Sequence, residues 1–499
     1  MTAVAALIAG LESRGILLSL AGEEIRYRSP KNALTAGDRE ALRSSRGAIL
    51  DYLKTRAAAR ALKTAGAITG PLMPSVAQEM WWHFAGEPEE GKPVALNIGM
   101  VGKFRHSAAA VTAAIHQVIA RYDALRVRFE SDGKKLAAFL NPAGSFEVEQ
   151  ETVPSGAAMQ GAQQFCAQLN AIEGQWLTRA KVFALSDGES LAAISAAHMI
   201  ADAGTRNIVL DEIHDILDHG GAPAAAPATL YNDYALAERE CLAGPQGDQL
   251  IGHWRDWYHS QPTMKAPSTG TPLLWGNGVR VIKNFTMPGP VRDSVSAYAE
   301  AMKVTPFLVY LTIFSITLAR WSGMERFPLR VLGDKRTSLD LSHTVGLMFC
   351  ADALEISVPS GAEFEATLRG ILAEYDASLA LRIPSLHFWA PHAVRPGIES
   401  RDHENKIPAV FNYYSVGTAR EKAQARAAPE NGADQPWPPH ITSVAQTWPR
   451  RSSPLFLHVM DMGHEAQMSL HFFQEVVSLE EQDRFTALLF QVFAETVPA

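Results

Sequence analysis

The stretch LAAISAAHMIADAGTRNIVLDEI, residues 191–213, decides the fold of this 499-residue chain. Its first half is a run of small and apolar residues typical of a buried strand, and the run ends at His198. A turn containing Asp202 follows, and apolar residues at helical spacing then predict a helix, with Thr205 or Asn207 as its N-cap. His198 is therefore expected where a strand enters a loop, a place where functional side chains gather.

This arrangement suits acid–base chemistry. An imidazole changes its charge near neutral pH, so His198 can take a proton from a substrate. Asp202 follows four residues later and can fix the loop by an ion pair. A histidine and an aspartate at this spacing occur in many unrelated proteins, so the pair alone does not define an active site.

The same stretch resembles the third core motif of the condensation domains of nonribosomal peptide synthetases, usually written HHxxxDG. His198 matches the second, catalytic histidine of that motif, and Asp202 matches the aspartate. Ala197 replaces the first histidine, which is chiefly structural in the family. Ala203 replaces the glycine beside the substrate channel, and its methyl group is expected to narrow the site, which would select smaller acceptors or slow the reaction.

Other motifs of the family occur in the expected order, so the resemblance extends over residues 71–499. Arg336 matches the fifth motif weakly, and we expect Asp202 to be structural and to pair with it. The family's asparagine in that motif falls near Cys350, which leaves one substrate contact in doubt. The remaining matches are 75–78 with Trp82, 121–129, 231–235, 345–346, 410–413 and 455–458. Of these, residues 121–129 are expected to be structural, and Trp81 and Trp82 are expected in the core.

The resemblance implies an α/β fold of two chloramphenicol acetyltransferase-like lobes in a V-shaped pseudo-dimer. Residues 71–246 are expected to form the first lobe, and residues 247–499 the second. A tunnel past His198 is expected between the lobes, with one mouth for a carrier-protein arm and the other for the acceptor.

Periodicity predicts several elements independently of the resemblance. Helices are expected over residues 104–121 and 162–177, and a long surface loop is expected over residues 421–448. The apolar residues 304–321 approach the length of a membrane span, but they open with Thr305-Pro306 and contain hydroxyl side chains. A buried core helix is therefore the prediction for this segment.

Residues 1–60 are expected to form a separate small domain with the order helix, hairpin, helix. Alternating apolar residues around Ala21-Gly22 predict the hairpin, and Thr35 is the expected cap of the second helix. The segment resembles the TubC-type, or β-hairpin, docking domain of assembly-line enzymes, with residues 61–70 as the linker that follows. The resemblance implies that the hairpin edge accepts an acidic C-terminal segment of an upstream protein by strand addition. The residues expected to make this contact are Ile16, Leu18, Arg26, Arg28 and Lys31.

Charge and cysteine usage bound the remaining possibilities. The net charge is −8, yet residues 1–66 carry 11 Lys and Arg against 6 Asp and Glu, a local balance of +5. A basic N-terminal segment on an otherwise acidic chain suits an acidic protein partner, and the overall negative charge gives no sign of nucleic-acid binding. The 3 cysteines show no disulfide or metal-ligand spacing, and the N-terminus lacks the pattern of a signal peptide. We therefore expect a cytoplasmic location and neither a membrane nor a nucleic-acid partner.

The resemblance also implies the reaction. A condensation enzyme transfers an acyl or peptidyl chain from a carrier-protein phosphopantetheine thioester to an acceptor hydroxyl or amine, with His198 as general base or orienting group. No metal or bound cofactor is expected, because the phosphopantetheine arrives on the partner. No adenylation, carrier or thioesterase domain is recognised after the condensation segment, and a GxSxG elbow is absent. These features favour a free-standing enzyme that releases the chain to a soluble acceptor.

Two alternatives remain open. The first is peptide-bond formation with a carrier-bound amino acid supplied in trans. The second, of another class, is a non-catalytic domain that recruits other enzymes. Ala197 and Ala203 favour this second interpretation, whereas the retained His198 and Asp202 oppose it.

Overall fold

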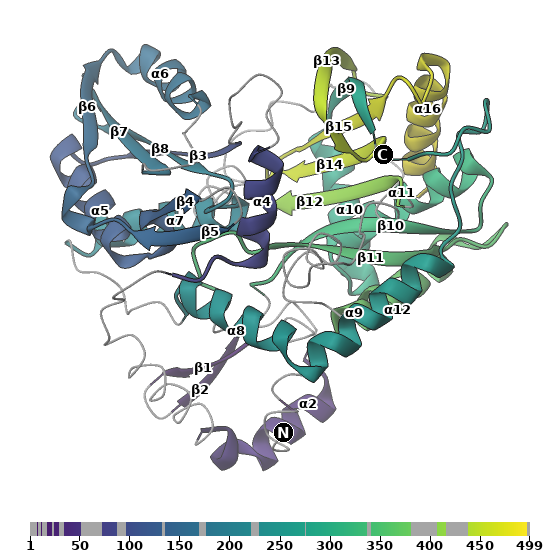
Figure 1. Cartoon of the computed structure of the whole chain (residues 1–499), viewed down its shortest axis with the longest axis horizontal. Coiled ribbons are helices and arrows are strands. Elements are labelled where there is room, and N and C mark those ends of the chain that lie inside the picture. The colour runs from purple at the N-terminus through teal and green to yellow at the C-terminus, as the bar shows by residue number, and fades with distance from the viewer. Residues whose placement is uncertain are drawn as a thin grey trace. The chain divides into compact units, whose positions relative to one another are not determined.

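A computed structural model shows that the chain forms two compact units (Figure 1). Unit 1 comprises Met1–Cys241 and Asp334–Phe349, and unit 2 comprises Leu242–Gly333 and Cys350–Ala499. The expected single boundary after residue 246 thus corresponds to a boundary after Cys241, with Asp334–Phe349 returning to unit 1. The structure describes residues 7, 11, 17–21, 24–28, 34–50, 72–86, 96–131, 135–168, 176–220, 229–274, 276–336, 341–380, 407–415 and 438–496.

The N-terminal segment contains the predicted hairpin. Strands β1 (Leu17–Ala21) and β2 (Glu24–Arg28) pair antiparallel and form a two-stranded sheet of their own. Leu18 is buried, whereas Tyr27, directly opposite it in β2, is exposed. Ile16, Lys31, the linker 61–70 and most of the first expected helix lie outside the described residues, and Arg26 and Arg28 are described by their backbone in β2.

The second predicted helix of this segment is confirmed. Helix α2 (Ala36–Ser44) begins after Thr35, whose hydroxyl accepts from the N–H of Asp38 while the Asp38 carboxylate accepts from the N–H of Thr35. This reciprocal capping satisfies two backbone donors that a helix otherwise leaves unpaired at its start.

The rest of unit 1 is built around a four-stranded sheet with the strand order β3-β8-β7-β6. The outer strand β6 runs parallel to β7, while the other neighbours are antiparallel. Every residue of the central strand β8 is buried, as the apolar run at residues 191–197 predicts. The bounds are β3 Asn97–Phe104, β6 Val148–Val153, β7 Thr178–Leu185 and β8 Ser190–Ala197, with a small hairpin of β4 Val127–Ser131 and β5 Leu136–Leu140.

Two helix predictions for unit 1 were wrong at their ends. The helix expected from residue 104 begins at Ala108, because β3 continues to Phe104 and Ser107 provides the cap. The helix expected over residues 162–177 lies earlier, at Ser155–Ala167. The helices of this unit are α4 Val76–Gly86, α5 Ala108–Arg121, α6 Ser155–Ala167, α7 Ala203–Asp218 and α8 Tyr231–Ala243, which reaches the unit boundary.

Unit 2 is a seven-stranded mixed sheet with the order β11-β10-β12-β14-β15-β9-β13. Strands β10, β12 and β14 are parallel to one another, and the pairs β14–β15, β15–β9 and β9–β13 are antiparallel. The strands are β9 Gly276–Met287, β10 Arg326–Asp334, β11 Phe349–Ser357, β12 Ala409–Ser415, β13 Thr442–Ser452, β14 Leu455–Asp461 and β15 Ala466–Phe473. The helices are α9 Pro245–Ser260, α10 Gly289–Met302, α11 Pro306–Ser322, α12 Phe364–Ala380 and α16 Leu479–Thr496.

Helix α11 is the core helix predicted from residues 304–321. It begins after Thr305 and has a proline in its first turn, and nearly all of its residues are buried in the core of unit 2. No single helix among the described residues is long and apolar enough to cross a membrane; α10 and α11 pass that test only as a pair bent by 105°.

The surface loop expected over residues 421–448 was wrong in its last part. Residues 442–452 form strand β13, which pairs with β9 at the edge of the sheet. An alternation of buried apolar and exposed polar residues would have indicated a strand. It is weak here because this edge strand has little buried surface, and Thr442, Ser443 and Val444 are all exposed. Residues 421–437 of the expected loop lie outside the described residues.

Gly346 shows why Asp334–Phe349 packs so closely within unit 1. Its backbone has φ +152°, which residues with a side chain rarely adopt, and a Cβ atom here would lie 2.0 Å from the Tyr231 ring. Only glycine allows the backbone to approach the ring this closely.

Replacing Gly346 by alanine is therefore expected to destabilise the protein. Overpacking costs roughly 1–3 kcal/mol, and backbone strain adds a cost of order 1–3 kcal/mol. The midpoint of denaturant unfolding should fall clearly. The matched control is Gly156→Ala in helix α6, where an added Cβ meets no atom within 4 Å, and there we expect no loss. Equal midpoints for the two variants would contradict this account.

Candidate active site

His198 occupies the position that the sequence predicted. Strand β8 ends at Ala197, His198 opens the following turn, and helix α7 begins at Ala203. The N–H of His198 donates to the carbonyl of Leu96 at 2.6 Å, and Ala197 pairs with Asn97 of β3. The backbone of the histidine is thus held by an extension of the sheet, a rigid support for a functional side chain.

Two aromatic rings contact the imidazole. Trp81 of α4 stacks on His198 with ring centroids 4.8 Å apart and planes 24° apart. Phe349 meets His198 edge-on, with centroids 5.8 Å apart. Trp81 was expected only as a core residue, and no feature of the sequence links it to His198. The ring of His198 is held mainly by packing, because its buried Nδ1 atom has no hydrogen-bond partner of good geometry among the described residues.

These surroundings favour the uncharged imidazole. Burial lowers the pKa of His198 below its usual value of 6.5, and nearby backbone groups together with the Asp202 carboxylate offset only part of that effect. Burial disfavours the charged form of any group because the charge loses its hydration. His198 is therefore neutral near pH 7 and able to accept a proton.

Asp202 has a different task from that of a catalytic acid or base. It is the N-cap of α7 and accepts from the N–H of Thr205 at 2.8 Å, so the expectation that Thr205 or Asn207 caps this helix was wrong. Its second oxygen accepts from the N–H of Met348 at 2.7 Å. A carboxylate is a stronger acceptor than a hydroxyl and also suits the positive end of the helix, which explains the earlier start.

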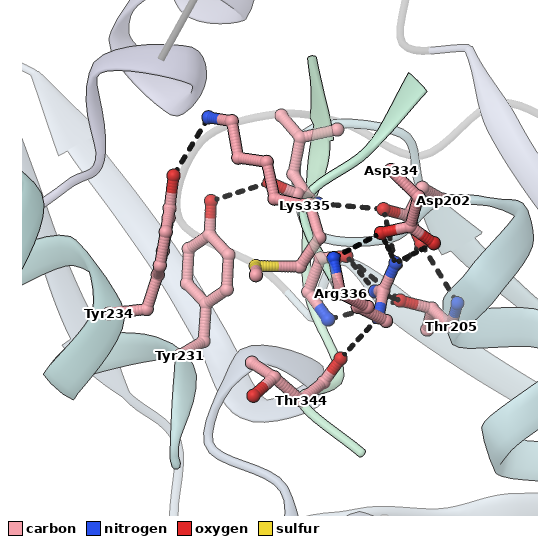
Figure 2. A network of polar contacts seen from close by, with 11 residues as sticks. Asp202, Thr205, Tyr231, Tyr234, Asp334, Lys335, Arg336 and Thr344 are labelled. Atoms are coloured by element: carbon pink, nitrogen blue, oxygen red, sulfur yellow. Dashed lines mark hydrogen bonds and ion pairs between the residues drawn. The ribbon is translucent and has the colours of Figure 1, made fainter. Parts of the chain in front are cut away.

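Arg336 is the partner of Asp202, as the sequence suggested. Its two terminal nitrogens donate to the two oxygens of Asp202 at 3.0 and 2.9 Å, and both side chains are less than a tenth exposed. Figure 2 shows that the same guanidinium also bonds Asp334, the hydroxyl of Thr205 and the carbonyl of Thr344. A further bond goes to the carbonyl of Gly346.

The pKa of Asp202 reflects this pairing. Burial alone would raise its pKa, but the Arg336 guanidinium, together with the N–H groups of Thr205 and Met348, holds the pKa below its usual range. Asp202 is therefore an anion near pH 7 whose oxygens are already engaged, so it cannot serve as the proton acceptor.

Residues 203 and 204 differ in what they contact. Ala203 is the first residue of α7 and is partly buried. A Cβ atom at Gly204 would lie 2.4 Å from a terminal nitrogen of Arg336 and 2.9 Å from a carboxylate oxygen of Asp334, so a side chain at residue 204 would displace this arrangement. The family motif has its glycine at position 203, whereas the close approach in this protein depends on position 204.

Residues of the other motifs form hydrogen bonds that hold the Asp334–Phe349 segment and the start of α8 in place. The hydroxyl of Ser75 lies 2.7 Å from that of Tyr231, which donates to the carbonyl of Leu347 at 3.1 Å. Buried Asp123 accepts from the N–H groups of Tyr231 and Asn232, which begin helix α8. These residues join the start of α4, α8 and the Asp334–Phe349 segment, and the contacts of Asp123 agree with the structural role expected for residues 121–129.

A second buried charge pair lies next to Arg336. Lys335 donates to the hydroxyl of Tyr234 at 2.8 Å and lies 3.7 Å from Glu238, as Figure 2 shows in part. Glu238 also accepts from the N–H of Val76 at 2.7 Å, at the start of α4. Since α4 carries Trp81, this network helps to place the ring that stacks on His198. Sequence reasoning missed Lys335 and Glu238, whose types are typical of exposed surface.

Comparison with known proteins agrees with this geometry. A family model described as Condensation domain matches residues 75–375. The chain belongs to the condensation-domain family. A second model, TubC N-terminal docking domain, matches residues 4–55, so this condensation-domain protein carries a docking domain of the TubC type.

Three relatives illustrate the similarity. A structure described as the molecular basis for condensation domain-mediated chain release from the enacyloxin polyketide synthase is 31% identical, has a TM-score of 0.77, and is matched over 100% of this chain and 97% of that one. The EpoB cyclization-docking bidomain from Sorangium cellulosum shares the fold with a TM-score of 0.60 at 15% identity, over 99% of each chain. Phosphinothricin tripeptide synthetase PhsC from Streptomyces viridochromogenes is 24% identical over 315 residues, which cover 59% of this chain but only 28% of PhsC.

Removing the guanidinium tests the Asp202–Arg336 pair. Arg336→Ala leaves a buried carboxylate uncompensated, and breaking such a pair typically costs roughly 3–5 kcal/mol. The control is Arg369→Ala, whose pair with Glu365 in α12 is half exposed on both sides, because an exposed pair contributes about 0–1 kcal/mol. Urea unfolding measures both free energies, and similar losses in the two variants would show that the buried pair is not the stabilising contact.

The lowered pKa of His198 predicts a pH profile. Between pH 8 and 5, NMR of histidines labelled at Cε1 should show His198 titrating below pH 6.5, with the assignment made from the spectrum of His198→Gln. A midpoint above 6.5 would contradict the burial argument, since burial opposes protonation. Any reaction that needs the free imidazole should remain at full rate above this midpoint and decline as the pH falls through it.

Proposed function

We propose that this condensation-domain protein is a free-standing acyltransferase. It transfers an acyl or peptidyl chain from the phosphopantetheine thioester of a carrier protein to a hydroxyl or amine, and it releases the chain to a soluble acceptor. The observation that carries the proposal is the neutral His198 imidazole at the end of β8, braced by Trp81 and flanked by the Asp202–Arg336 pair. The similarity to the enacyloxin chain-releasing structure over the full length of this chain supports release rather than elongation.

His198 acts on the proton of the acceptor. As the acceptor oxygen or nitrogen attacks the thioester carbonyl, His198 takes its proton, and the new ester or amide bond replaces the C–S bond. The proton then passes to the departing thiolate, so no net charge is left. General-base assistance of this kind contributes about 10²–10⁴-fold, and an alcohol depends on it more than an amine does because its neutral oxygen is a weak nucleophile.

The phosphopantetheine belongs to the partner in this scheme, so the reaction requires no cofactor bound to this chain. The TubC-type docking domain is proposed to recruit that partner. Among the described residues, strands β1 and β2 pair with each other alone, and an outer edge of such a hairpin is where a strand could be added. The basic balance of residues 1–66 favours an acidic C-terminal segment of an upstream synthase, contacted by Ile16, Arg26, Arg28 and Lys31. The side chain of Leu18, expected among these contacts, is buried and therefore supports the hairpin from inside.

The test is unloading of an acyl-charged carrier protein. Wild-type protein should remove the acyl group in the presence of a soluble alcohol or amine, and intact-protein mass spectrometry follows both carrier and product. His198→Ala should slow this step by roughly 10²–10⁴-fold, the range of general-base assistance. The matched control is His219→Ala, at the exposed C-cap of α7, which should keep the wild-type rate.

Other outcomes separate the alternatives. Product formed only when the acceptor is an aminoacyl group on a second carrier protein would indicate peptide-bond formation in trans. Carrier binding by both wild type and His198→Ala, without unloading by either, would indicate a recruiting domain and overturn the enzymatic proposal.

A further inference from the structure

A row of polar side chains crosses the sheet of unit 2. Asn412 in β12 lies opposite His458 in β14, which lies opposite Ser469 in β15. Ser469 in turn lies opposite Asn284 in β9, and Asn284 lies opposite Thr442 in β13. Residues directly opposite each other in a sheet point to the same face, so these five form one line across five strands.

This face is the one turned away from the core helices. Side chains alternate along a strand, and the neighbours Phe285, Val459 and Met468 are part of the core that contains α10, α11 and α16. The polar row therefore occupies the opposite face. Helix packing does not require polar residues there, and their alignment across the sheet is a feature that burial alone does not explain.

The row carries no charge near neutral pH. Burial, together with nearby Arg280, lowers the pKa of His458 to about 4. Burial, together with the adjacent His458 and Arg280, lowers the pKa of His471 to about 3. The remaining members are two amides and two hydroxyls. The side-chain nitrogen of Asn412 lies 3.1 Å from Nδ1 of His458, and Nε2 of His471 lies 3.2 Å from the hydroxyl oxygen of Ser469. The two imidazoles therefore fix the orientation of the Asn412 and Ser469 side chains.

A cavity of about 550 Å³ lies over one end of the row. Ser469, Asn284 and Thr442 line it, together with Gln467 and Thr286 from the next line of opposed residues. Its volume falls within the roughly 300–1,000 Å³ typical of small-molecule sites. No Asp, Glu, Lys or Arg side chain is among the described residues that line it, and His440 is the one titratable side chain among them.

We infer that this cavity binds a small neutral molecule, or a neutral part of one, that carries several amide or hydroxyl groups. Each member of the row can both donate and accept a hydrogen bond. Neighbouring strands lie about 4.8 Å apart, so the row recognises polar groups repeated at about that spacing. All residues involved belong to unit 2, so the site does not depend on the reaction proposed for His198.

Binding by ligand-observed saturation-transfer NMR tests the inference on the full chain at pH 7.5. The probes are the neutral diamide N-acetyl-β-alaninamide, the neutral polyol xylitol, and the matched carboxylate N-acetyl-β-alanine. At least one neutral probe should bind, and the carboxylate should bind more weakly. The double variant Ser469→Ala/Thr442→Val should weaken binding roughly tenfold, since each lost hydrogen bond is worth about 0.5–1.5 kcal/mol and about 1.4 kcal/mol is tenfold.

Ser443→Ala is the matched control, because Ser443 follows Thr442 in β13 and points to the other face. It should bind like wild type, and so should His198→Ala, which separates this site from the catalytic proposal. Tighter binding of the carboxylate, binding unchanged in the double variant, or no binding of either neutral probe would each overturn the inference.

Discussion

The ion pair between the guanidinium of Arg336 and the carboxylate of Asp202 is the interaction on which the site in unit 1 depends. It joins the N-terminus of α7 to the Asp334–Phe349 segment, which returns to unit 1 from the middle of the sequence of unit 2. A planar, permanently charged group with five donors can satisfy a carboxylate and several carbonyls at once, which lysine could not do. The cost of burying these charges is offset only because nearly every donor and acceptor is engaged.

That contact divides the work between two side chains of one short turn. Asp202 is ionised and fully engaged, so it holds the turn, and proton transfer is proposed for His198 alone. His198 is packed between aromatic rings and stays neutral because burial opposes its protonation. The two groups are four residues apart in sequence, yet their surroundings keep Asp202 ionised and His198 neutral. Ionisable groups whose pKa values are shifted by their surroundings are typical of active sites.

The faces of the unit 2 sheet show a related contrast. One face is apolar and packs against long helices, as expected for a domain core. The other face carries a row of uncharged polar groups in register beside the charged Arg280, and burial together with that guanidinium keeps its imidazoles neutral. A protein can thus place polar groups beside one another without net charge, provided that burial keeps the titratable members neutral.

Local patterns in the sequence determined much of this protein. The buried run before His198, the hairpin at residues 17–28, the cap at Thr35 and the core helix at α11 all depend on interactions within a few residues, and each was predicted. Helix ends were less well predicted. Helix α7 begins earlier than expected because Asp202 is a better capping acceptor than Thr205 or Asn207. Helix α5 begins later than expected because β3 continues to Phe104 and Ser107 is the cap.

Only the tertiary structure decided which distant residues meet. Trp81 reaches His198 across more than 100 positions, Lys335 meets Glu238 in the interior, and Gly204 admits Arg336. The polar row joins strands from residue 284 to residue 469, and it exists only when every strand register is set. The order of the family motifs identified Arg336 as the partner of Asp202. The other contacts join residues far apart in the chain and depend on side-chain packing, which periodicity within a short stretch of sequence does not indicate.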